Sequence, residues 1–322
     1  MSNIESLEVK QGSRGKGFLE AGPYFDNRAG ATVKIRKYVR IPYYVIKGVE
    51  EGPTLCVTAG AHPTEYAGID TAIRLSKEVS PKDLKGKLIV VPVVNVPGFW
   101  ERSYVCPICG VDINDSYRKG GKSDGTIGEM IAYELVNEIL LNADYHLDLH
   151  GTDTSESCIP FAKILKIGDS RIDMESENIA RALGIELSEY LRVQARERKT
   201  KIPKASCEVG QGDKLIPELS TALFEGVINV MRYLKMIKGR HRQKEYVLME
   251  PKTITSNQDG FFYFCMKLGD IVEEGQVIGK VKNLDGEVIE TIISPYNGVI
   301  HFMIHNPVVH AGEKLLNIGV FL

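Results

Sequence analysis

The chain has 322 residues, 43% of them hydrophobic and 25% charged, which is typical of a folded globular protein of roughly two domains. Forty lysines and arginines stand against 42 aspartates and glutamates, and a net charge of -2 favours neither nucleic acid nor an anionic membrane as a partner. The longest apolar run, 88–94, is far shorter than the roughly 20 residues of a membrane span, and the N-terminus has no apolar signal segment, so we expect a cytoplasmic protein.

Short apolar runs alternate with helical patterns from residue 54 to about 235, which is typical of an α/β architecture with a largely parallel sheet. Apolar residues at three- and four-residue steps predict a helix over 127–140, and 174–183 and 216–235 have further helical patterns. In open α/β sheets ligands bind beyond the carboxyl ends of the strands, so residues there are the first candidates for a site. The predicted strands are 54–60, 87–95, 145–149 and 205–209.

Two basic stretches, 192–204 and 235–244, contain no interleaved aromatic residues. We interpret them as a solvated loop and an interdomain linker rather than as a nucleic-acid patch. Helical periodicity stops at the second stretch, and short β-like runs with Gly and Asp turns begin. The sequence therefore predicts two domains, residues 1–245 and 246–322.

The predicted C-terminal domain contains an internal repeat, because residues 259–275 resemble 297–312. Two such units are too few for a solenoid, so we predict a small quasi-twofold β barrel or sandwich. The domain resembles the barrel-sandwich fold of biotinyl and lipoyl carriers. Those carriers present a modifiable lysine on a central hairpin, whereas the corresponding hairpin here, 283–287, contains none, and we expect an unmodified domain.

Cys106 and Cys109 form a Cys-Pro-Ile-Cys sequence that is like half of a zinc knuckle. A structural zinc site needs a second ligand pair at similar spacing, and the other four cysteines are scattered singly. We favour an ordinary loop with two reduced thiols, and leave a metal site or a redox clip as the alternatives.

Two histidines and a carboxylate follow predicted strands. His62 and Glu65 stand three positions apart after the first strand, and His150 directly follows the third. Two histidines and a glutamate are a ligand set of hydrolytic zinc sites, in which a fourth position is left for water. A lone His-x-x-Glu is a weak signal, but the strand-end placement of both histidines favours a metal site. Asp148 shares a strand face with His150 and is either its hydrogen-bond partner or a solvated acid.

Five segments, in this order along the chain, carry a resemblance to a known family: GPTLCVTAGAHPTEYAG, NVPGFWERSY, GVDIND, DLHG and SCEVG. Together they resemble the succinylglutamate desuccinylase/aspartoacylase family of zinc-carboxypeptidase-like hydrolases, over most of the chain. The resemblance implies an α/β fold with a mixed, mostly parallel sheet flanked by helices, followed by a small all-β domain. It also implies that His62, Glu65 and His150 bind one zinc ion per chain, and that Glu208 is the catalytic general base and acid.

The substrate loop departs from the family at one position. Arg102 lies where the resemblance places a cationic substrate contact, and Asn114 matches the Asn of the family's Asp-Leu-Asn-Arg motif. Asp115 stands where the family has Arg, which disfavours a free carboxylate there unless Arg118 restores the positive charge. Otherwise Asp115 recognises an amine, as in an N-acylated diamine or diamino acid.

We therefore predict a zinc-dependent amidohydrolase that removes the acyl group from a small N-acylated amino acid or amine. Zinc activates water, and Glu208 moves the proton to the leaving amine. The alternatives are a zinc carboxypeptidase or peptidase with the same ligands, and a non-catalytic metal-binding protein of the same fold. The expected partner is a small N-acyl molecule, with no nucleic acid and no membrane, and a homo-oligomer is left open.

Overall fold

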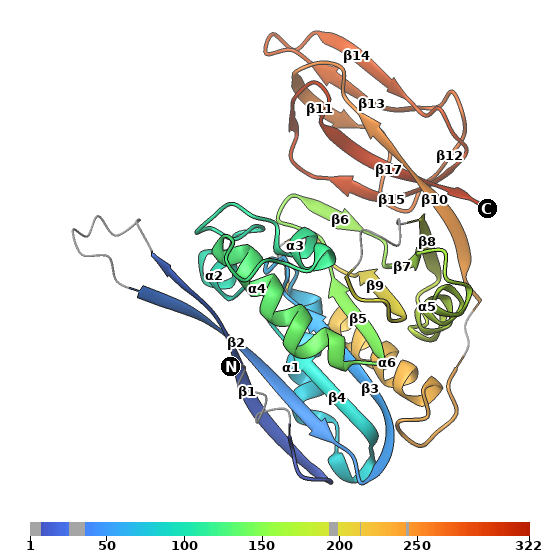
Figure 1. Cartoon of the computed structure of the whole chain (residues 1–322). Helices are drawn as coiled ribbons and strands as arrows, with labels where there is room; N and C mark the ends of the chain where they lie inside the picture. The colour runs from blue at the N-terminus through green and yellow to red at the C-terminus, as the bar shows by residue number, and fades with distance from the viewer. Residues whose placement is uncertain (1–7, 26–35, 193–198, 213, 243–244) are drawn as a thin grey trace.

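The computed structural model describes residues 8–25, 36–192, 199–212, 214–242 and 245–322. Its main sheet has the strand order β1-β2-β4-β3-β5-β9-β7-β8 and continues through β10-β17-β15-β12 (Figure 1). The first eight of these strands are β1 (Ser13–Phe25), β2 (Arg36–Lys47), β4 (Lys85–Val91), β3 (Glu50–Ala59), β5 (Tyr145–His150), β9 (Lys204–Glu208), β7 (Phe161–Lys166) and β8 (Leu187–Arg192).

The centre of this sheet is parallel, as predicted. Strands β4, β3, β5 and β9 run in the same direction, whereas β2 joins β4, and β7 joins β9, in antiparallel pairs. The four predicted strands correspond to β3, β4, β5 and β9. Strands β1 and β2 were not predicted; they pair antiparallel, and buried positions largely alternate with exposed or half-buried ones along both.

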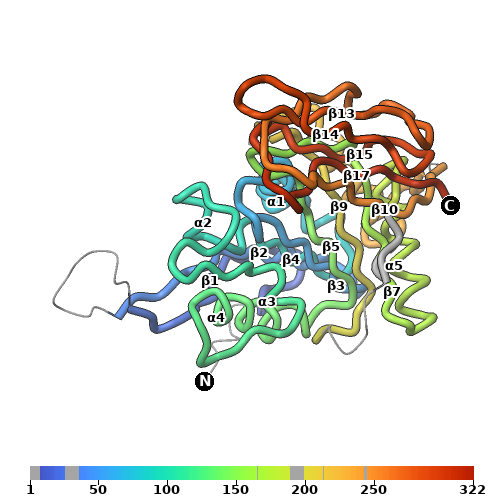
Figure 2. The backbone as a smooth tube through the Cα atoms, turned by 90° about the horizontal axis from the view of Figure 1, so that it is seen from above, coloured from blue at the N-terminus to red at the C-terminus, as the bar shows by residue number. Residues whose placement is uncertain are grey.

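Helices cover both faces of the sheet. Alternate residues of β3 point to opposite faces: Leu55 and Val57 pack in one core with α1 (Tyr66–Glu78), α5 (Ser170–Ala182) and α6 (Pro217–Tyr233). Cys56 packs in a second core with α3 (Ile113–Lys119) and α4 (Ile127–Glu134), which lie across the strands from α1 (Figure 2). The α/β prediction with flanking helices is therefore confirmed.

The predicted helices are confirmed with shifted ends. The apolar pattern over 127–140 forms α4, followed by a π-helical turn (Leu135–Ile139) and a 3₁₀ turn (Leu140–Asn142). The patterns over 174–183 and 216–235 correspond to α5 and α6. No helix within the described residues combines the length and apolar character that crossing a membrane requires.

The C-terminal strands form an antiparallel β sandwich above the helices and the first eight strands of the main sheet (Figure 1). A four-stranded sheet, β14-β13-β11-β16, packs its apolar residues against the β10-β17-β15-β12 part of the main sheet. The predicted small all-β fold is thus confirmed. Its strands are β10 (Val247–Thr255), β11 (Gly260–Phe264), β12 (Ile271–Val272), β13 (Val277–Lys282), β14 (Val288–Ile293), β15 (Gly298–Ile304), β16 (Val308–Val309) and β17 (Lys314–Phe321).

The internal repeat appears as an exchange of short strands between its two units. Strand β12 of the first unit pairs with β15 of the second, and β16 of the second pairs with β11 of the first. Val272 lies opposite Gly298, and Val309 lies opposite Gly260, so equivalent residues make equivalent pairs. The quasi-twofold pattern of the sequence is therefore a property of the strand pairing.

The sandwich is joined to the rest of the molecule by backbone hydrogen bonds. Strand β10 pairs in parallel with β8, and β6 (Glu156–Cys158) pairs with β15. The amide of His305 also donates to the carbonyl of Ser155, at 2.6 Å. The main sheet therefore extends across the predicted boundary between residues 245 and 246. The division into two domains stays a prediction. The basic stretches 192–204 and 235–244 lie partly outside the described residues.

Gly68 provides a test of how tightly α1 packs on β5. A Cβ at this position would lie 2.7 Å from the carbonyl oxygen of Leu149. We expect Gly68→Ala to lower the free energy of unfolding by about 1–3 kcal/mol, because overpacking outweighs the gain in helix propensity of roughly 1 kcal/mol. Urea denaturation measures this, with the exposed Lys77→Ala on the same helix as the control. A stabilised Gly68→Ala protein would contradict the close contact.

Candidate metal centre

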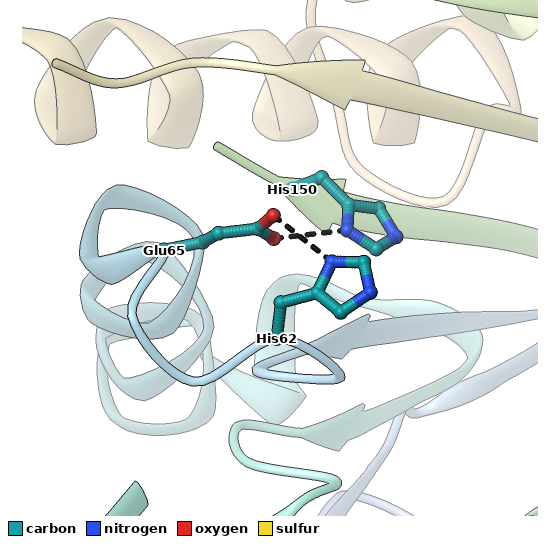
Figure 3. Close-up of side chains that lie close together, drawn as sticks. All are labelled: His62, Glu65 and His150. Carbon is teal, nitrogen blue, oxygen red and sulfur yellow. Dashed lines mark hydrogen bonds and ion pairs between the residues drawn. The ribbon is translucent and has the colours of Figure 1, made fainter. Parts of the chain in front are cut away.

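His62, Glu65 and His150 meet at the carboxyl ends of β3 and β5, which are parallel neighbours. The amide of Glu65 donates to the carbonyl of His62 at 3.2 Å, and this turn brings both side chains to the end of β5, where His150 is the last residue. Figure 3 shows the Glu65 carboxylate pointing toward both imidazoles. Its oxygens lie 3.0 Å from Nδ1 of His62 and 2.9 Å from Nδ1 of His150. All three side chains are buried, with one possible ligand atom of each within 4.8 Å of the others.

Each imidazole has an acid at its other nitrogen. Nε2 of His62 lies 3.3 Å from Oδ1 of Asp112, and Nε2 of His150 lies 3.2 Å from Oδ2 of Asp148. Such outer carboxylates fix the orientation of metal-binding histidines and raise their basicity. Of the two alternatives for Asp148, the structure therefore favours the hydrogen-bond partner. The contact of Asp112 was not predicted, although this residue lies in the GVDIND segment.

His62, Glu65 and His150 stabilise one another's charged forms. Burial alone would raise the pKa of Glu65 and lower those of the histidines. The imidazoles instead lower the pKa of Glu65 to about 2, and the carboxylates of Glu65 and Asp112 raise the pKa of His62 to about 9. Asp148 and Glu65 likewise raise the pKa of His150. The acids thus create a negative environment that attracts a cation.

A buried polar network lies behind His150. Asp148 accepts hydrogen bonds from Nζ of Lys204 at 2.7 Å, from Oγ1 of Thr58 at 2.6 Å and from the hydroxyl of Tyr117. Although burial opposes it, the charges of Lys204 and His150 hold the pKa of Asp148 well below its usual range. The partner of His150 is therefore itself fixed, by groups from three different elements.

Glu208 is the last residue of β9 and lies opposite His150 in the register of β5 and β9. Its carboxylate forms an ion pair with Lys163 of β7. Burial raises the pKa of Glu208, the positive charge of Lys163 opposes this, and the negative charge of Glu65 adds to it. Glu208 thus lies next to His150 on the neighbouring strand. Lys163 was not predicted, because only the antiparallel pairing of β7 with β9 brings it there.

The segment after α2 (Val96–Glu101) also contacts His62. Arg102 ends this helix in the left-handed conformation, with φ of 53°, and its side chain is exposed. The ring of Tyr104 stacks on His62, with centroids 3.9 Å apart and planes inclined by 16°. Burial raises the pKa of the Tyr104 hydroxyl, and the charge of Glu65 adds to this effect. Arg102 thus lies near the site in sequence, but the contact with His62 is made by Tyr104.

Asp115, which stands where the family has Arg, lies on the first turn of α3. Asp112 caps this helix by accepting from the amides of Asn114 at 2.8 Å and Asp115 at 3.3 Å. The exposed carboxylate of Asp115 pairs with Nη2 of Arg118 at 2.7 Å. Arg118 therefore balances the charge of Asp115, and both lie further along the helix than Asp112, which contacts His62.

The set of two imidazoles and one carboxylate fits a divalent transition-metal ion, because these are the usual ligands of zinc and its neighbours. In the part of the chain that the structure describes, His62, Glu65 and His150 are the one cluster of three or more residues that could hold a metal. The metal interpretation of Cys106 and Cys109 gains no support from their surroundings.

Comparisons with known proteins agree with this geometry. The model of the succinylglutamate desuccinylase/aspartoacylase catalytic domain matches residues 51–234, a range that contains all the residues of the site. The N-alpha-acetyl-L-2,4-diaminobutyric acid deacetylase of Halomonas elongata is 30% identical over 260 residues, which cover 76% of this chain and 75% of that protein.

Two solved structures share the fold. The Ectoine utilization protein EutE (DoeB) from Ruegeria pomeroyi, in a product-bound structure, is 24% identical, with a TM-score of 0.86 and coverage of 97% of both chains. The succinylglutamate desuccinylase/aspartoacylase from Rhodobacter sphaeroides is 22% identical, with a TM-score of 0.85 and coverage of 98% of both chains. At these identities the similarity establishes the architecture.

Proposed function

Since this chain belongs to the succinylglutamate desuccinylase/aspartoacylase family, we propose that it is a zinc-dependent deacylase acting on a small N-acylated amino acid or amine. The observation that carries the proposal is the convergence of His62, Glu65, His150 and Glu208 at the ends of three adjacent parallel strands. In this proposal the first three residues hold zinc. When bound, zinc acts as a Lewis acid and lowers the pKa of a bound water to about 7.

Glu208 is proposed as the general base and acid. Its carboxylate removes a proton from the attacking water and later donates it to the amine that leaves, because an amine is a poor leaving group until it is protonated. The environment suits both roles. Burial raises the pKa of Glu208, which favours proton donation, while the ion pair with Lys163 opposes that rise and keeps the basic form accessible.

Asp112 and Asp148 would orient the two metal-binding imidazoles through Nε2. Tyr104, stacked on His62, and Arg102, two residues earlier, would border the position of the substrate. We assign Asn114 a role in positioning the substrate oxygen, because it follows Asp112 on the helix that approaches His62.

For the substrate we propose an N-acylated diamino acid. The Halomonas elongata relative is a deacetylase of N-alpha-acetyl-L-2,4-diaminobutyric acid, a molecule with a second amine and a carboxylate. The paired charges of Asp115 and Arg118 offer complementary partners for these two groups. A peptide is a less suitable substrate, because the C-terminal sandwich packs on the segment 155–158 that follows His150.

The test is release of amine from a panel of N-acetyl diamino acids, N-acetyl aspartate, N-acetyl glutamate and short peptides by the zinc-loaded protein. We expect preference for the diamino acids. Asp115→Asn should lower kcat/KM for them by about tenfold or more, the effect of one hydrogen bond to a charged group. The control is Asp124→Asn, which changes an exposed acid in a neighbouring loop and should have little effect.

Three outcomes would contradict the proposed substrate or activity. Release of C-terminal residues from peptides would favour the peptidase. A strong preference for N-acetyl aspartate that survives Arg118→Ala would argue against recognition of an amine by Asp115. With zinc bound and no turnover of any compound, a non-catalytic metal-binding protein becomes the better explanation.

A further inference from the structure

The loop between α2 and α3 carries two thiols between the two residues that contact His62. Tyr104 precedes Cys106 and Cys109 in this loop, and Asp112 follows them. The amide of Cys106 donates to the carbonyl of Val111 at 2.9 Å, so the loop is closed at its base, next to both contacts. The two thiols therefore lie in the same closed loop as both contacts to His62.

The turn places the thiols within reach of a disulfide. The carbonyl of Cys106 accepts from the amides of Cys109, at 3.3 Å, and Gly110, at 2.7 Å. A turn closed in this way keeps its end Cα atoms within about 7 Å, and disulfides join Cα atoms about 4.4–6.8 Å apart. The neighbouring thiol of Cys106 also lowers the pKa of Cys109, so the two thiols interact.

The surroundings of Cys109 favour its thiolate. Its sulfur lies at the N-terminus of α4, where the amide of Gly128 donates to it at 3.4 Å. The hydrogen bond from Cys106 lowers the pKa of Cys109 to about 5, burial opposes this, and Val111, Gly128 and Thr126 add smaller lowering effects. The thiolate is the nucleophile in disulfide exchange.

The absence of a side chain at Gly128 allows the approach of the sulfur, because a Cβ there would lie 3.1 Å from it. Cys109 is partly exposed, whereas Cys106 is fully buried. One thiol is therefore placed to react with a molecule in solution, and the other to complete the reaction inside the loop.

We propose that Cys106 and Cys109 are a redox-active dithiol that a small-molecule disulfide, such as oxidised glutathione, converts to an intramolecular disulfide, and that this lowers activity at the adjacent site. The Cys109 thiolate attacks one sulfur of the oxidant and releases the other as a thiolate. Cys106 then loses its proton, attacks the Cys109 sulfur and displaces the second thiolate. Two protein thiols are oxidised, and one disulfide is reduced to two thiols.

The effect on the site follows from the contacts that the sulfur gives up. Once joined to Cys106, the sulfur of Cys109 no longer holds a negative charge against the amide of Gly128, and the loop loses this link to α4. The base of the loop then shifts, and Tyr104 and Asp112 shift with it. Tyr104 stacks on the ring of His62, and Asp112 contacts its Nε2 atom.

Intact-mass measurement of the zinc-loaded protein after treatment with oxidised glutathione tests the chemistry. We expect the wild type to lose two hydrogens without gaining glutathione. Cys106→Ser should accumulate a glutathione adduct on Cys109, and Cys109→Ser should do neither. All of these comparisons are made in a Cys265→Ser background, because the exposed thiol of the sandwich would itself take up glutathione.

Zinc affinity and turnover test the coupling. Oxidation should weaken zinc binding by about tenfold, as for the loss of an outer partner of a metal-binding histidine, and lower turnover reversibly. Cys109→Ser should be insensitive to the oxidant. The proposal fails if no disulfide forms in the wild type, or if it forms and zinc affinity is unchanged. An absence of turnover in both redox states would instead count against the proposed function, because mass and zinc affinity do not depend on it.

Discussion

Replacement of Glu208 by Gln is expected to lower kcat by about 10²–10⁴-fold, the usual contribution of general acid–base catalysis. The amide has the size of the carboxylate but neither removes a proton from water nor returns one to an amine. Because both transfers use the same group, the loss should appear in kcat, with KM changing little. Steady-state kinetics of amine release, with the best compound of the panel, measures the two constants.

The matched control is Glu156→Gln. Glu156 is a partly buried acid on β6, in the segment that follows His150, but its carboxylate pairs with Lys314 of the sandwich at 3.6 Å. We expect a change of less than about tenfold, because a partly exposed ion pair contributes roughly 1 kcal/mol or less. Zinc content should be unchanged in both variants. A Glu208→Gln protein with normal kcat and a full complement of zinc would remove this residue from the proposed mechanism.

The residues of the site that could be predicted are those whose position depends on local order. His62, Glu65, His150 and Glu208 each stand at or just after the end of a short strand that is buried over most of its length, as is typical of the parallel strands at the centre of an α/β sheet. Parallel strands bring their carboxyl ends to one edge of the sheet, so the proximity of these four residues follows from the strand assignment. The C-terminal repeat was visible for a similar reason, since equivalent segments of the chain form equivalent pairs.

The missed contacts depend on pairings that no local pattern encodes. Lys163 reaches Glu208 only because β7 runs antiparallel to β9, and Tyr104 reaches His62 only because the loop after α2 folds back over the strand end. In the same way, the parallel pairing of β10 with β8 extends the main sheet into the sandwich. These arrangements are decided by packing between distant segments, where the periodicity of single elements carries no information.

The second large effect concerns stability. We expect Lys204→Met to lower the free energy of unfolding by about 3–5 kcal/mol, because it leaves the carboxylate of Asp148 charged and buried without its ammonium partner. Lys204 is nearly buried, and its Nζ lies 2.7 Å from Asp148, over the ring of Tyr117. Urea denaturation with a chelator present measures the effect without a contribution from bound metal.

Two comparisons separate the effect of the lost Lys204 charge from a general loss of packing. Lys85→Met removes one partner of the exposed Lys85–Glu50 pair, at 2.6 Å, and should change stability by about 1 kcal/mol or less. In the double variant Asp148→Asn with Lys204→Met, the buried carboxylate that has lost its ammonium partner is gone, so the loss should be smaller than the sum of the single losses. Additive losses would mean that the methylenes of Lys204, rather than its charge, stabilise this region. Asp148 also lies 3.2 Å from Nε2 of His150. The single variant Asp148→Asn should therefore bind zinc about 10–100-fold more weakly, which would link the stability of the buried network to the metal centre.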